Sequence, residues 1–187
     1  MRLALAALVA AACTGAEAQQ APLAGLDRDA GAATAPPTYV TIPAGWQVLP
    51  EVGATGVAAA RATVRSRATT RAQTWGDPGL GCFVTIVDVT GARPTQLAEV
   101  AEELRGVLAA TLAVEDWSTG GGPSIEVGGA ISKGSMRGRV RARLVAEPSG
   151  VPHAAVAACF YNQREPARCQ DACTRVLATL EAPKVMP

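Results

Sequence analysis

Four cysteines in the body of the chain carry the clearest chemical signal in the sequence. Cys169 and Cys173 are four residues apart, so on a helix both thiols lie along one face. Cys82 and Cys159 lie in apolar stretches that have the composition of strands. An even number of cysteines in a chain that is expected to leave the cytosol favours two disulfides. Three pairings are possible, and we expect Cys82 or Cys159 to join the helix pair rather than Cys169 to join Cys173.

A redox pair or a metal site is the competing interpretation of Cys169 and Cys173. Dithiols of the thioredoxin kind have a two-residue spacer, and zinc sites usually repeat such a spacing. Here the spacer has three residues and occurs once. We therefore predict structural disulfides, no metal and no cofactor, with a thiol-disulfide oxidoreductase using Cys169 and Cys173 as an alternative function.

Arginines alternate along two stretches that have strand composition. One set is Arg137, Arg139, Arg141 and Arg143, and the other is Arg61, Arg65 and Arg67. Period-two spacing places each set on one face of a sheet. If the two strands were neighbours, the arginines would form a basic patch able to bind phosphate or carboxylate groups. A solvated sheet face explains the same alternation and is the favoured interpretation, with an anion-binding protein as a second alternative function.

The remaining polar residues do not form a catalytic set in the sequence. His153 is the only histidine, so a hydrolase would have to use it, and we expect it at the surface. A phosphate-binding loop joins a strand to a helix, and Gly120 to Gly122 are not in such a position. We therefore interpret them as a flexible loop. The acidic pairs Glu102-Glu103 and Glu115-Asp116 have the character of solvated faces. We predict that the protein is not an enzyme and has no catalytic residues.

Three tryptophans stand out in a chain with 4% aromatic residues, and each lies next to an expected turn or element end. Trp46, Trp75 and Trp117 are expected in the core, and the alternative is that they line a ligand groove or a partner surface. The scarcity of aromatic residues and the formal net charge of +1 argue against nucleic-acid binding.

The start of the chain has the pattern of a secretion leader. Met1-Arg2 precedes an apolar run from Leu3 to Ala12, and Ala16-Glu17-Ala18 supplies small residues for cleavage, which predicts a signal peptide over 1–18. Ala10 to Cys13 also loosely resembles a lipobox, so a lipoprotein leader over 1–12 with acylation at Cys13 is the alternative. Residues 19–37 have the composition of a disordered tether, and 38–183 are expected to form a single domain.

The expected elements follow the order strands, helix, strands, helix. Strands are predicted over 39–42, 61–67, 80–89, 125–131, 136–146 and 151–161, and helices over 95–112 with Thr95 as the N-cap and over 166–181. Trp75 to Gly79 is predicted as a loop, and Lys133-Gly134 and Pro148-Ser149-Gly150 as turns. Hairpin-length links predict an α+β fold, a mostly antiparallel sheet with two helices packed on it.

This order of elements, together with Ile42-Pro43-Ala44-Gly45-Trp46 near the expected domain start, resembles the PsbP-like group, which includes bacterial DcrB-type exported lipoproteins. The resemblance covers about 38 to 182, and the Pro-x-Gly-Trp turn is its only motif. It implies a non-enzymatic binding or assembly factor and transfers no catalytic residue.

These observations predict an exported, non-catalytic binding or interaction domain, periplasmic, secreted or lipid-anchored. Its partner would be an unidentified protein or envelope ligand, and not a nucleic acid. Contact with a membrane would arise through lipidation at Cys13. The sequence leaves the ligand and the oligomeric state open.

Overall fold

The described residues form a seven-stranded antiparallel sheet with a helix packed on each face. A computed structural model describes residues 37–50, 67–161 and 166–183. The elements along the chain are β1 (Gln47–Val48), β2 (Arg67–Asp77), β3 (Cys82–Gly91), α3 (Leu97–Ala109), β4 (Ala113–Thr119), β5 (Ser124–Lys133), β6 (Met136–Ala146), β7 (Pro152–Tyr161) and α4 (Pro166–Ala178). The strands lie in the order β1-β2-β3-β7-β6-β5-β4 and every neighbouring pair is antiparallel. The predicted α+β class is therefore confirmed.

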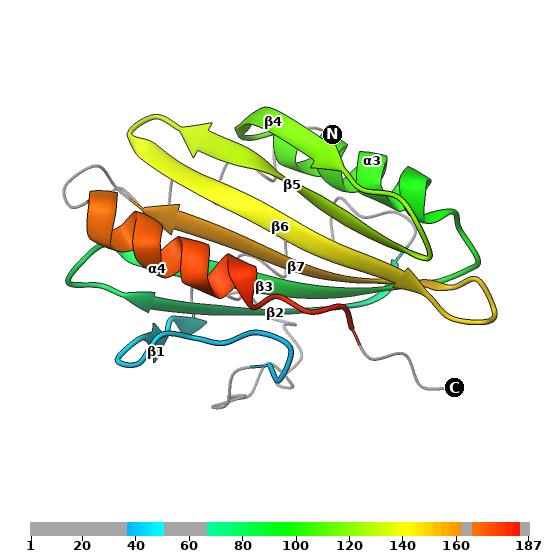
Figure 1. The fold of residues 1–187 in the computed structure, drawn as a ribbon, viewed down its shortest axis with the longest axis horizontal. Helices are drawn as coiled ribbons and strands as arrows, with labels where there is room; N and C mark the ends of the chain where they lie inside the picture. Colours follow the sequence, from blue (N-terminus) through cyan, green and yellow to red (C-terminus); the bar gives the residue numbers. More distant parts are fainter. Residues whose placement is uncertain (1–36, 51–66, 162–165, 184–187) are drawn as a thin grey trace, which may run out of the picture.

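Successive side chains of a strand point to opposite faces of the sheet, so the core consists of two layers, one on each face. On one face α4 packs on β7 and β6, and its buried Cys169, Cys173 and Val176 join a cluster with Val84 and Ile86 of β3. On the other face α3 packs on β4, β5 and β6. Figure 1 shows α4 lying across the near side of the sheet and α3 behind β4 and β5. On the side of α4, neither β5 nor β4 is covered by a described helix.

One expected strand and one expected loop near the start of the domain were misplaced, and the strand expected over 61–67 lies outside the described residues except for Arg67. Residues 39–42 form no strand, because their backbone groups bond elsewhere: the Tyr39 carbonyl accepts from the Glu181 N–H at 2.9 Å, and the Thr41 N–H donates to Thr179 Oγ1 at 2.9 Å. The edge strand is instead β1. Trp75 to Asp77, predicted as part of a loop, belong to β2, and the turn begins only at Pro78. The Asp77 carboxylate closes that turn by accepting from the Leu80 N–H at 3.1 Å.

The second half of the chain also differs from expectation in its details. Strand β4 was not predicted, and its ladder with β5 is irregular between Glu115 and Ser118, where Asp116 has a φ of 52°. Thr95 is not the N-cap of α3. Gln96 holds that position without a side-chain cap, and the Thr95 hydroxyl donates to the Arg93 carbonyl at 3.2 Å. Helix α4 ends at Ala178, three residues before the predicted end at 181.

The predicted hairpin turns are confirmed. Gly134 follows β5 with a φ of 57°, a left-handed conformation that glycine adopts without a steric cost, and β6 begins two residues later. The Gly150 N–H donates to the Glu147 carbonyl at 2.8 Å and closes the β6–β7 turn. Across the described ranges, the helices are too short or too polar to span a bilayer.

Candidate binding groove beside α4

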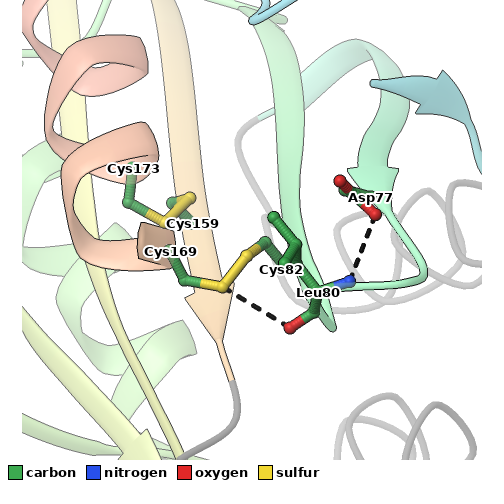
Figure 2. Close-up of a disulfide and its surroundings, with 6 residues drawn as sticks. All are labelled: Asp77, Leu80, Cys82, Cys159, Cys169 and Cys173. Carbon is green, nitrogen blue, oxygen red and sulfur yellow. Dashed lines mark hydrogen bonds between the residues drawn. A yellow bond between two sulfur atoms is a disulfide. The ribbon is translucent and has the colours of Figure 1, made fainter. Parts of the chain in front are cut away.

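Two disulfides fasten α4 to the sheet. Cys82 of β3 is bonded to Cys169, and Cys159 of β7 is bonded to Cys173, with Cα–Cα distances of 5.7 and 5.6 Å. Figure 2 shows the two bridges one helical turn apart, both reaching from α4 down to the strands. The expectation that each strand cysteine joins a helix cysteine agrees with this arrangement. All four residues are buried, so the bonds are part of the core on this face.

The disulfide pairing also affects the alternative interpretation of Cys169 and Cys173 as a redox pair. Cys169 and Cys173 are not bonded to each other, and each sulfur is already engaged with a buried partner on the sheet. The Cys169 sulfur also lies 3.6 Å from the Leu80 carbonyl oxygen (Figure 2). Redox dithiols require an accessible thiolate. The geometry therefore does not favour an oxidoreductase that uses Cys169 and Cys173.

Strand register sets a row of residues beside α4. Cys159 of β7 is directly opposite Arg139 of β6, Arg139 is opposite Ala130 of β5, and Ala130 is opposite Glu115 of β4. Directly opposite residues share a face of the sheet. Because Cys159 is bonded to α4, this row runs outward from the helix across the uncovered strands. Arg139 and Glu115 are thus two strand spacings apart, about 9–10 Å between backbones, with one methyl group between them.

Small residues on β5 make this part of the face hollow. Gly128, Ala130 and Ser132 alternate along the strand on the side of α4. A groove of about 520 Å³ lies here. Its lining includes Arg137 and Arg139 from β6, Glu115 from β4, and Gln170, Asp171 and Thr174 from α4. Gln170 Nε2 donates to the Tyr161 hydroxyl at 2.8 Å, which joins the helix wall to the last strand.

Two of the four β6 arginines share one carboxylate partner within the structure. Arg141 Nε is 2.7 Å from Glu126 Oε1 and Arg143 Nη1 is 2.6 Å from Glu126 Oε2. The hydrogen bond from Arg141 is the largest cause that lowers the pKa of Glu126 below its usual value. Arg141 Nη1 also donates to the Leu177 carbonyl at 2.7 Å, in the last turn of α4. Arg141 therefore links the helix to the sheet, and Arg143 is held beside it by the same carboxylate of β5.

The other two arginines line the groove. Arg137 Nη1 donates to the carbonyls of Gly134 and Met136, at 2.9 and 3.1 Å. The exposed side chains of Arg139, Glu115 and Asp171 have no hydrogen-bond or ion-pair partner within 37–50, 67–161 and 166–183. The groove thus carries free charges of both signs.

The second arginine set does not extend this groove. Arg67 begins β2, and β3 and β7 lie between β2 and β6, so the two strands are not neighbours. Arg61 and Arg65 lie outside the described residues, as does Cys13. Of the residues predicted to form a basic patch, the structure brings together the four on β6.

A second groove, of about 480 Å³, lies where α4 ends, lined by residues 38–41, Arg143 and residues 178–182. Beside it, the Tyr39 hydroxyl donates to Asp88 Oδ1 at 2.5 Å. Burial raises the pKa of Asp88 above its ordinary value, while the Tyr39 hydrogen bond and the nearby Arg71 charge act in the opposite direction. Burial and the Asp88 carboxylate also raise the pKa of Tyr39.

We expect Asp88→Asn to change how stability depends on pH. A carboxyl group whose pKa is higher in the folded than in the unfolded chain stabilises the fold most when protonated, and this stabilisation is lost as pH rises through the folded pKa. Asparagine removes that loss and keeps an oxygen that accepts from Tyr39. Denaturant unfolding should show the variant gaining stability relative to the parent as pH rises above the ordinary pKa range of an aspartate.

Tyr39→Phe provides the matched comparison for this prediction. It removes the hydrogen bond that lowers the pKa of Asp88 and leaves the burial that raises it. The loss of stability with rising pH should then extend to higher pH and be larger in total than in the parent protein. A pH profile unchanged in both variants would show that Asp88 does not titrate differently in the two states.

His153 belongs to a polar cluster at the β6–β7 hairpin and not to either groove. Its Nε2 is 2.6 Å from Glu147 Oε1 and its Nδ1 is 3.3 Å from the Thr90 hydroxyl. The hydrogen bonds from His153 and then Ser149 lower the pKa of Glu147. His153 was expected at the surface, but its side chain is 20% exposed and both ring nitrogens have partners. This arrangement gives no support to a hydrolase that uses His153.

The three tryptophans do not share a site. Trp75 is buried on the α4 face, where Trp46 packs against the same cluster, whereas Trp117 packs with the α3 layer on the opposite face. Trp75 is thus a core residue as expected, whereas Trp46 and Trp117 are partly buried at the margins of the two layers. No common aromatic groove forms among the described residues.

Several groove residues were missed by the sequence reasoning. Gln170 and Asp171 lie on the polar face of α4 next to the two cysteines, and Ala130 belongs to a strand that carried no functional signal. The signal that was available is the run of small residues at alternate positions of β5, which predicts a hollow on an otherwise polar face. Within the described ranges, no three or more histidine, cysteine, aspartate or glutamate side chains cluster so as to hold a metal ion.

Fold and groove together define an α+β domain in which helix α4 is crosslinked to an antiparallel sheet. No known protein family matches the chain, and no curated protein sequence matches it. A solved structure, LpqN involved in cell envelope biogenesis of Mycobacterium tuberculosis, is similar at 17% identity with a TM-score of 0.38. The match covers 74% of this chain and 79% of LpqN. That score is too low to establish a shared fold.

Proposed function

We propose that the protein is an exported, non-catalytic binding domain and that the groove beside α4 is its ligand site. The two buried disulfides carry this proposal. Disulfides persist in the periplasm and outside the cell, and are reduced in most cytosols. The expected leader over 1–18, or over 1–12 with acylation at Cys13, supports the same conclusion from independent residues.

The groove supports a binding role in particular. It combines a rigid helix wall, a hollow strand surface and free charged side chains, which are the features of a preformed polar site. Cys173 lines the groove but is buried and bonded to Cys159, and His153 lies outside the groove. The PsbP-like resemblance, which also implies a binding or assembly factor, stays a prediction.

Thiol counting by intact mass tests the export proposal. The protein is isolated from cell fractions of its native host, treated with a maleimide before and after reduction, and weighed. We expect it outside the cytosol, with no labelled cysteine among the four before reduction and four labels after it, and the mass also reveals cleavage after residue 18 or acylation at Cys13. Full-length protein in the cytosol with labelled thiols before reduction would overturn the proposal.

A further inference from the structure

We infer that the groove beside α4 binds a zwitterion, a small group that carries a phosphate or carboxylate and a primary ammonium a few bonds apart. This inference deepens the proposed binding function and rests on it. It differs from the expected anion site because the charges that line the groove balance. Arg137 and Arg139 contribute two positive charges, and Glu115 and Asp171 contribute two negative charges.

Arg139 is the group that would hold the anionic end. It projects from the centre of the row between Cys159 and Ala130, and within the described part of the chain its guanidinium has no partner. A guanidinium binds phosphate or carboxylate through two parallel hydrogen bonds. Arg137 lies two residues away on the same face, but its Nη1 is already bonded to two carbonyls, so Arg139 is the freer donor.

The ammonium end would be held by the carboxylates on either side of Arg139. Glu115 lies two strands away across Ala130, and Asp171 lies on the helix wall. Neither carboxylate makes an ion pair with Arg139 in the structure, although all three side chains line one groove. The backbone separation of about 9–10 Å between Arg139 and Glu115 leaves room for a small molecule between the two charged ends.

A simple polyanion fits this groove poorly. A second phosphate placed near Arg139 would approach Glu115 or Asp171, and juxtaposed like charges oppose binding. The remaining β6 arginines do not offset this repulsion, because Arg141 and Arg143 do not line the groove and both are held by Glu126. The balance of charge therefore selects for a ligand that carries both signs.

Calorimetric titration of the purified, oxidised protein with O-phosphoethanolamine tests this inference, with inorganic phosphate and ethanolamine as single-charge probes. We expect O-phosphoethanolamine to bind at least about tenfold more tightly than either probe.

Arg139→Gln should weaken the binding of O-phosphoethanolamine by at least about tenfold, the loss expected for one charge-assisted contact. The double variant Glu115→Gln, Asp171→Asn should bind O-phosphoethanolamine no more tightly than it binds inorganic phosphate. Arg105→Gln and Glu99→Gln, exposed changes on α3 at the opposite face, are the matched controls and should bind as the parent does.

Co-sedimentation distinguishes the two sources of such a group. Binding to vesicles of phosphatidylethanolamine and phosphatidylcholine, but not of phosphatidylcholine alone, would identify a lipid headgroup with a primary ammonium. Binding to the free compound alone would identify a soluble ligand.

Equal affinity for inorganic phosphate, no binding of any probe, or unchanged binding in the Arg139 and carboxylate variants would each overturn the zwitterion site. These outcomes are separable from the export proposal, which fails only if the native protein has free thiols in the cytosol.

Discussion

Replacing Cys82 and Cys169 together by alanine should lower the free energy of unfolding by about 4 kcal/mol. The bridge joins residues 87 positions apart. Crosslinking so long a loop removes many conformations from the unfolded chain, and the cost of removing the crosslink grows with the logarithm of loop length. Guanidinium unfolding of the parent and the double variant, followed by circular dichroism, measures the difference.

The second bridge is the matched control for the first. Cys159 and Cys173 are 14 positions apart and are buried on the same helix face. Alanine at both positions should cost about 3 kcal/mol, less than the longer bridge. If the Cys159 and Cys173 variant were the less stable of the two, the difference would have to arise from packing beneath α4 rather than from loop length.

Gly138→Ala should lower the free energy of unfolding by about 3 kcal/mol. Gly138 lies on β6 opposite Phe160, and a Cβ atom there would be 2.2 Å from the Cys159 carbonyl oxygen and 3.2 Å from the Phe160 ring. That oxygen belongs to the backbone of β7, so the strands must separate to accept a methyl group. Phe160 also stacks on Phe83, with ring centroids 5.3 Å apart, so the displacement would reach β3.

Gly121→Ala controls for the loss of glycine itself. No atom lies within 4 Å of a Cβ built at Gly121, which is in the exposed β4–β5 loop. Its substitution should change stability by less than about 0.5 kcal/mol. Equal stability of the Gly138 and Gly121 variants would mean that the β6–β7 pairing adjusts to the extra atom without cost.

Most of the fold was predictable because its strands and helices have strong periodic patterns. The alternation of Arg137 to Leu144 predicted β6, and the spacing of Cys169, Cys173 and Val176 predicted α4 and its buried face. Strand β4 was missed because its irregular ladder at Glu115 to Ser118 interrupts the alternation that identifies a strand. Tyr39 to Ile42 has strand composition but is held by the end of α4, a tertiary effect that composition does not encode.

The site was less predictable than the fold, because it depends on which strands are neighbours. The sequence showed that the β6 arginines share a face, but not that Ala130 and Glu115 continue the row beside Arg139. Nor could it show that Glu126 would pair with both Arg141 and Arg143, since these ion pairs depend on the β5–β6 register. The sequence predicted that helix cysteines would be bonded to strand cysteines. Which strand cysteine each helix cysteine joins could be seen only in the folded structure.

Helix α4 is anchored along its whole length before any ligand arrives. Covalent bonds hold its first half, and Arg141 together with the Tyr39–Glu181 and Thr41–Thr179 hydrogen bonds holds its end. A molecule that enters the groove therefore meets an immobile wall, and little conformational freedom remains to be lost on association. Selectivity in such a site depends on shape and charge match, because the helix cannot shift to accommodate a poorly fitting compound.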